Sequence, residues 1–177
     1  MAGFISYQIE NEQSLKEHSQ ELVDKVAFEL GFKTKRKEVR LAIRFAKGAS
    51  HTNWRTGQTT YDAEELARLL VRGFRSKHGE RIRPRPFFKN YMNYYSEDVR
   101  DIVIETFRIY SHWSVTNRCY MAGKRILEDF KRKVYTGSLG LAGNQGKYAL
   151  RKIGAGYGDI PLVVTKAMFE ALEVVVE

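Results

Sequence analysis

Side chains that could carry chemistry are few in this 177-residue chain and lie scattered along it. The carboxylates of Asp62 and Glu65 could form a nuclease centre with a basic residue, but helix capping explains both. Cys119 is the only cysteine and is expected on the apolar face of a helix. The histidines lack the spacing of metal ligands: His18, His51, His78 and His112. We therefore predict no catalytic residue, no metal and no cofactor.

A glycine-rich stretch from Thr136 to Gly158 invites comparison with phosphate-binding loops. It contains seven glycines, yet it has neither the G-x-x-x-x-G-K-[ST] pattern nor a strand followed by G-x-G-x-x-G. Nucleotide binding is therefore rejected. Because segments rich in glycine or small polar residues bury little apolar surface, we expect this stretch and the loop from Lys47 to Tyr61 to be poorly ordered in an isolated subunit and ordered in the assembly.

The chain is strongly basic, with a formal net charge of +9 and an isoelectric point near 9.6. Eight basic residues between Arg68 and Lys89 face the single acid Glu80. This balance implies an anionic partner: nucleic acid, an acidic protein surface or lipid headgroups. No apolar run has the length of a membrane span and the first residues do not form a signal peptide, so we expect a protein that is not exported.

The segment that leads from Asp62 to Phe88 joins a capped helix to an Arg-Pro-Arg-Pro-Phe-Phe sequence. Gly73 is placed to end the helix near Arg72. Each arginine of the motif precedes a proline, which favours extended backbone, so Arg83 and Arg85 are predicted to project together. Phe87 and Phe88 would form an apolar anchor. The alternative is a stiff connection in which both phenylalanines are buried for packing.

Periodicity along the chain predicts an α+β fold, a small antiparallel sheet packed against several helices in one domain of residues 1–177. Helices are expected from Asn11 to Leu30, from Ser96 to about Tyr110 and from Ser114 to Val134, with a turn or short helix over 167–171. In the loop before Asp62, Trp54 and Arg55 are candidates for an intersubunit contact. The expected strands are 4–9, 39–46, 162–165 and 172–176.

Two stretches resemble the tail-completion or head-to-tail joining (neck) proteins of tailed bacteriophages, which are also described as virion-morphogenesis proteins. Ile82 to Phe87 matches the I-P-A-R-P-F element of that family, with Arg83 and Pro84 where the family often has Pro and Ala. Lys152 to Val176 resembles the family's C-terminal ending. It departs from the usual Thr-Gly after Pro-Leu-x, because Val164 and Thr165 follow Pro161, Leu162 and Val163.

The resemblance implies a structural virion protein that assembles with itself as a hexameric ring at the neck or upper tail. Its partners would be neighbouring neck, connector or tail-tube proteins, with transient contact to passing DNA, and it would reside in the host cytoplasm during assembly. The alternative function is that of a basic nucleic-acid-binding protein. The predicted assembly interface consists of Trp54, Arg55, Arg81, Arg83, Pro84, Arg85, Pro86, Phe87, Phe88, Pro161 and Leu162.

Overall fold

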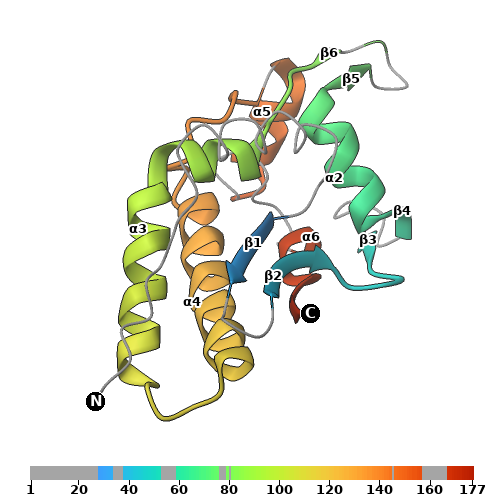
Figure 1. The fold of residues 1–177 in the computed structure, drawn as a ribbon. Helices are drawn as coiled ribbons and strands as arrows, with labels where there is room; N and C mark the ends of the chain where they lie inside the picture. Colours follow the sequence, from blue (N-terminus) through green and yellow to red (C-terminus); the bar gives the residue numbers. More distant parts are fainter. Residues whose placement is uncertain are drawn as a thin grey trace.

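Two long antiparallel helices stand at one side of the computed structural model, α3 (Phe87–Ile109) and α4 (Val115–Tyr135) (Figure 1). The structure describes residues 28–33, 38–52, 59–75, 79, 81–144, 146–156 and 167–177. Ser114 caps α4, and its hydroxyl accepts a hydrogen bond from the Asn117 amide at 3.2 Å. The helix predicted from Ser114 is thereby confirmed.

A kink divides α3 at Tyr95, where φ is −128° and ψ is 23°. The helix start predicted at Ser96 coincides with this kink, but the helix as a whole begins earlier, directly after Pro86. A proline is well tolerated just ahead of a helix, since the first-turn amides need no partner inside the helix. The polar and aromatic run before Ser96 therefore continues the helical backbone instead of forming a loop.

Three antiparallel strands form the main sheet, in the order β1 (Phe28–Lys33), β2 (Glu38–Phe45) and β7 (Leu172–Val176). Ile43 of β2 lies opposite Phe28 of β1 and Val174 of β7. Beyond β7, Arg40 and Glu177 exchange backbone hydrogen bonds of 2.8 and 2.9 Å. The strands predicted over 39–46 and 172–176 are confirmed, and so is the α+β class.

Helix α4 lies between α3 and the sheet, so that the molecule is layered at this side (Figure 1). Gly123 permits the close approach of α4 to the strands. A Cβ atom added there would come within 2.5 Å of a methyl carbon of Leu41 and of Val174. Cys119, which is fully buried on the same helix, belongs to the core as predicted.

The remaining elements are short and surround α2 (Ala63–Arg72). Asp62 caps this helix, because its Oδ1 accepts from the amides of Glu64 at 2.8 Å and Glu65 at 3.2 Å. Gly73 ends it with a φ of 73°. The other elements are β3 (Ser50–Thr52), β4 (Thr59–Asp62), β5 (Phe74–Arg75), β6 (Arg81–Ile82), α5 (Gly146–Gly154) and α6 (Ala167–Glu170).

Two sequence-based predictions about these regions need correction. Leu30 and Gly31 belong to β1 and not to the end of a helix, because β2 provides a hydrogen-bonded partner strand. The segment Lys47 to Tyr61, predicted as a loop, contains β3 and part of β4. The glycine-rich stretch contains α5 and the fully buried Leu139, and the difference in its order between free and assembled protein stays a prediction. The strands predicted over 4–9 and 162–165 lie outside the described residues, whereas the short helix expected over 167–171 is confirmed.

Candidate assembly surfaces

The Arg-Pro-Arg-Pro segment forms an internal joint of the subunit. The Arg85 amide donates to the carbonyl of Leu70 in α2 at 2.8 Å. Its buried guanidinium donates to the Ala142 carbonyl at 3.1 Å and to the Asn144 side chain at 3.0 Å, with a longer contact of 3.4 Å to the Gly143 carbonyl. Arg85 thus fastens the glycine-rich loop to the start of α3.

Beside this joint, Phe87 and Phe88 enter an aromatic cluster. Phe87 is fully buried and meets Phe169 of α6 edge to face, with ring centroids 5.4 Å apart. Phe88 stacks on Phe130 of α4 at 4.8 Å with an interplanar angle of 13°. The two side chains therefore link α3, α4 and α6 inside one subunit, as the packing alternative predicted.

The prediction that Arg83 and Arg85 project together is wrong. Arg83 is exposed, but Arg85 is buried because loop carbonyls that follow α4 satisfy its guanidinium. Of the predicted interface, Arg81, Arg83 and Pro84 are exposed, Pro86 and Phe88 are half-buried, and Arg85 and Phe87 are interior. The other four members lie outside the described residues: Trp54, Arg55, Pro161 and Leu162.

Arg81 belongs to a small hairpin made of β5 and β6, in which it lies opposite Arg75. Gly73 sets the position of this hairpin. A Cβ atom there would stand 2.7 Å from the carbonyl oxygen of Ile82 and 2.9 Å from the Pro84 ring. The hairpin is therefore held tightly against the end of α2, and Arg75 and Arg81 extend from it into solvent.

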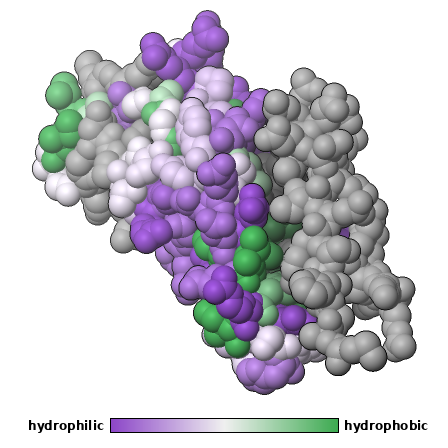
Figure 2. All heavy atoms as spheres, turned by 60° about the vertical axis from the view of Figure 1, so that its left-hand side comes forward, coloured by the Kyte–Doolittle hydropathy of each residue, from purple (hydrophilic) through white to green (hydrophobic). Residues whose placement is uncertain are grey.

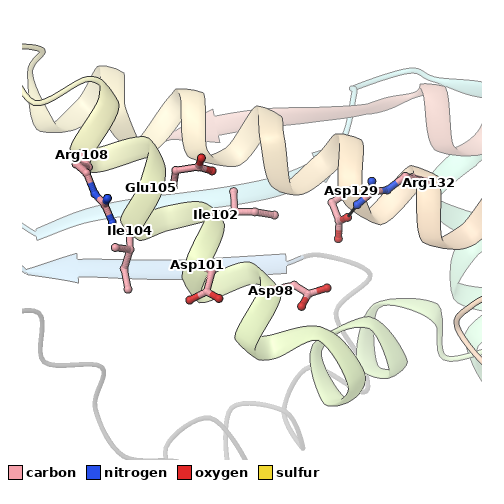
Figure 3. A pocket seen from close by; sticks show the side chains of 8 residues that line it. All are labelled: Asp98, Asp101, Ile102, Ile104, Glu105, Arg108, Asp129 and Arg132. Atoms are coloured by element: carbon pink, nitrogen blue, oxygen red, sulfur yellow. Dashed lines mark hydrogen bonds and ion pairs between the residues drawn. The ribbon is translucent and has the colours of Figure 1, made fainter.

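An open groove lies along α3 and α4 (Figure 3). Its carboxylates are largely neutralised within the subunit. Asp98 pairs with Lys133 at 3.2 Å, Glu105 pairs with Arg125, and Asp129 pairs with Arg132. The lining residues are Asp98, Asp101, Ile102, Ile104, Glu105, Arg108, Asp129 and Arg132.

Asp129 joins this groove to the core. Its carboxylate accepts from the Tyr91 hydroxyl at 2.9 Å as well as from Arg132. Burial of the ring, and then the hydrogen bond to Asp129, raise the pKa of Tyr91 far above its ordinary value. Tyr91 therefore remains a neutral donor, and the Asp129 carboxylate serves to hold α3 to α4. The described residues contain no group of three or more side chains placed to hold a metal ion.

Large apolar side chains are left in solvent on several elements, and the sequence analysis did not identify them as a surface. Figure 2 shows hydrophobic atoms gathered near the lower end of the molecule, the end at which α3 turns into α4 in Figure 1. There the rings of Tyr110 and Trp113 are 4.5 Å apart. A helical-wheel analysis of α5 could have identified some of these apolar side chains from the sequence. The exposed members are Tyr94, Ile104, Ile109, Trp113, Tyr120, Leu150 and Ile153.

In comparisons with known proteins, no protein-family model, curated protein or solved structure matches the chain. Separately, none of the helices in the described part combines the length and apolar character that a membrane span requires.

Proposed function

We propose that this chain is a structural virion protein of a tailed bacteriophage, which assembles as a ring at the head-to-tail junction and joins head to tail. The observation that carries the proposal is the exposure of large apolar side chains on helices, namely Ile104 and Ile109 on α3 and Leu150 and Ile153 on α5. Such side chains gathered on the surface of a folded domain mark contacts with other proteins. The sequence resemblance supplies the identity of those proteins: further copies of the chain and neighbouring neck, connector or tail-tube proteins.

The fold is compatible with this role. Of the two stretches that carry the resemblance, the Arg-Pro-Phe element connects α2 and the hairpin to α3 through buried contacts of Arg85 and Phe87. We infer that the motif recurs because it fixes the subunit's shape. In this proposal, exposed side chains make the assembly contacts, and they include Arg81, Arg83 and Pro84 of the predicted interface.

The nucleic-acid alternative loses part of its support in the basic segment from Arg68 to Lys89. Arg68 pairs with Glu64 at 2.6 Å, one turn away on α2. Arg85 is committed to the interior. A duplex-binding surface needs several cations directed at phosphates, and its affinity falls steeply with salt.

A particle-joining assay tests the proposal. Heads and tails that are assembled without this chain are mixed with the purified protein, and joined particles are counted by electron microscopy. We expect joining to depend on the added protein. An unrelated basic protein of similar size serves as the control. If the chain binds neither heads nor tails but binds duplex DNA with a steep salt dependence, the nucleic-acid function replaces this one.

A further inference from the structure

The hairpin of β5 and β6 places two arginines side by side. Arg75 and Arg81 are cross-strand partners, so both side chains leave the same face of the hairpin, with their Cβ atoms about 5 Å apart. Both are exposed, and neither makes an ion pair with any residue that the structure describes. Like charges directly opposite each other destabilise an antiparallel pair. A bound anion would turn this unfavourable arrangement into a favourable one.

Contacts within the subunit hold the hairpin in place. Gly73 joins it to α2 so closely that a Cβ atom would stand 2.7 Å from the Ile82 carbonyl oxygen. Phe74 lies opposite Ile82, and both side chains are half-buried against the core. The chain that follows is fixed by the hydrogen bond from the Arg85 amide to the Leu70 carbonyl. Because the backbone beneath the two arginines is already fixed, a ligand has to order only their side chains.

The surroundings of this arginine pair are basic as well. Arg72, Arg83 and Lys89 are exposed in the same segment of the chain. The one carboxylate of the segment, Glu80, lies outside the described residues, and the five exposed cations, the pair included, exceed it by four charges. The loop and helix over residues 136–156, part of which packs beside this segment, contain no acidic residue. The hairpin is therefore a site of concentrated positive charge.

We propose that the β5–β6 hairpin binds the phosphate backbone of duplex DNA through Arg75 and Arg81. A guanidinium donates paired hydrogen bonds to phosphate oxygens, and two guanidinium groups on one face can reach the same phosphate or neighbouring ones. The inference goes beyond the proposed function, since it needs no contact with heads or tails. It assigns Arg81 to DNA and leaves Arg83 and Pro84 of the predicted interface to contacts between proteins.

A single strand is a poorer ligand for this hairpin. Proteins that bind single strands combine cations with exposed aromatic rings on which the bases stack. The aromatic residues of the described part of this segment are Phe74, Phe87 and Phe88, and none of them is exposed. Contacts made by cations alone suit the duplex backbone, which offers its phosphates while the bases stay stacked.

A second copy of this chain is also a poorer partner. A matching surface would need several carboxylates that lie together without partners of their own. A phosphate backbone, by contrast, presents its anions in a continuous row. Many exposed carboxylates of the chain are instead paired within the subunit: Glu64 with Arg68, Asp98 with Lys133, Glu105 with Arg125, Glu170 with Lys131 and Glu177 with Arg44.

Fluorescence anisotropy with a labelled duplex of about 20 base pairs measures the binding, with salt varied between about 50 and 200 mM. The two variants replace Arg75 and Arg81 together, by alanine or by lysine. Each phosphate contact contributes about −0.9 to the slope of log affinity against log salt. The alanine pair should therefore bind about tenfold more weakly at the lower salt and reduce the steepness of the slope by about 2. The lysine pair should keep most of both, because an ammonium keeps the charge.

The matched control is the combination of Arg100→Ala and Arg108→Ala. Both arginines are exposed on the part of α3 beyond its kink, and neither has an ion pair within the described residues. Figure 1 shows this part of α3 far from the hairpin, so the control removes the same charge elsewhere and should leave the slope nearly unchanged. Urea denaturation checks the fold. The hairpin variant should be at least as stable as the original chain, because it relieves the like-charge pair.

Several results would overturn the inference. They are an original chain that does not bind the duplex, equal losses for the two alanine combinations, or tighter binding of a single strand of the same length. Polyglutamate that competes as strongly as unlabelled duplex at equal charge would assign the hairpin to an acidic protein instead. The particle-joining assay separates this failure from failure of the proposed function. If the original chain joins heads to tails but binds no duplex, only this inference is wrong, and hairpin-dependent DNA binding without joining would reject the proposed function alone.

Discussion

At the scale of single residues, the structure changes the predicted role of Arg85 most, from an assembly contact to an interior one. A guanidinium presents several donors in a fixed plane, and here three acceptors of the 142–144 loop receive them. Loops rich in glycine lose much conformational freedom on ordering, so an arginine that ties down such a loop offsets that loss. The residue thus stabilises a segment that composition alone marks as mobile.

Arg85→Ala should lower the free energy of unfolding by about 2 to 4 kcal/mol, because it removes the donors to three partly buried acceptors and opens a cavity at a buried position. Arg85→Lys should recover only part of this loss, since an ammonium cannot match the planar arrangement. The control is Arg81→Ala at an exposed position, which should stay within about 0.5 kcal/mol of the original chain. Urea denaturation measures all three, and equal losses for Arg85→Ala and Arg81→Ala would contradict the structural role.

At the scale of elements, the layering of α3, α4 and the sheet depends on small residues and on charged pairs that cross the helix interface. Lys133 contacts both the Asp98 carboxylate and the Tyr95 ring, whose centroid is 3.8 Å from the ammonium. Arg125 reaches Thr106 at 2.9 Å. These contacts fix how α4 is seated against α3, and Gly123 then fixes its distance from β2 and β7.

Gly123→Ala should destabilise the protein by about 1 to 3 kcal/mol, because the new methyl group would overlap Leu41 and Val174 in the packed core. The helix propensity of alanine, better than that of glycine by roughly 1 kcal/mol, works in the opposite direction and is outweighed. Gly154→Ala in α5 is the matched control, since nothing lies within 4 Å of its Cβ position. Thermal unfolding of the two variants distinguishes overlap from propensity, and an unchanged melting temperature for Gly123→Ala would show that α4 is not closely packed.

At the scale of the whole molecule, alkaline pH should destabilise the fold. Burial and hydrogen bonds to carboxylates raise the pKa values of Tyr91 and Tyr135, and burial raises that of Cys119 to about 11. Above the unfolded-state pKa of each group, the unfolded chain binds fewer protons than the native one, so stability decreases as pH rises. The loss should begin near pH 9 for the thiol and near pH 10 for the tyrosines.

Urea denaturation at pH 8, 9.5 and 10.5 measures this dependence. Tyr91→Phe should be less stable at pH 8, because Asp129 loses a donor, yet its stability should fall less steeply above pH 10. The slope lost should approach about 1.4 kcal/mol per pH unit for a fully titrating group. Parallel curves for the variant and the original chain would show that Tyr91 ionises normally in the fold.

The sequence by itself determined the features that depend on neighbouring residues. Asp62 and Ser114 predict helix starts, because their side-chain oxygens can cap a first turn. Gly73 predicts a helix end, and the alternation of apolar and other residues from Val39 to Phe45 predicts the central strand. Each of these signals depends only on residues close by in the sequence, so it can be recognised without knowledge of the rest of the fold. The burial of Cys119 followed in the same way from helical periodicity.

Contacts between residues that are far apart in the sequence were decided only by the tertiary structure. The acceptors of Arg85 are 57 to 59 residues away from it, so nothing in the local pattern tells whether that guanidinium faces solvent or the interior. Leu30 and Gly31 read as the end of a helix until β2 supplies a partner strand. The local pattern likewise does not tell that Leu150 and Ile153 of α5 are exposed while Lys152 of the same helix is buried. Local propensity fixes the elements, but burial is a property of the packed chain, because each side chain's surroundings are set by residues that the sequence does not place beside it.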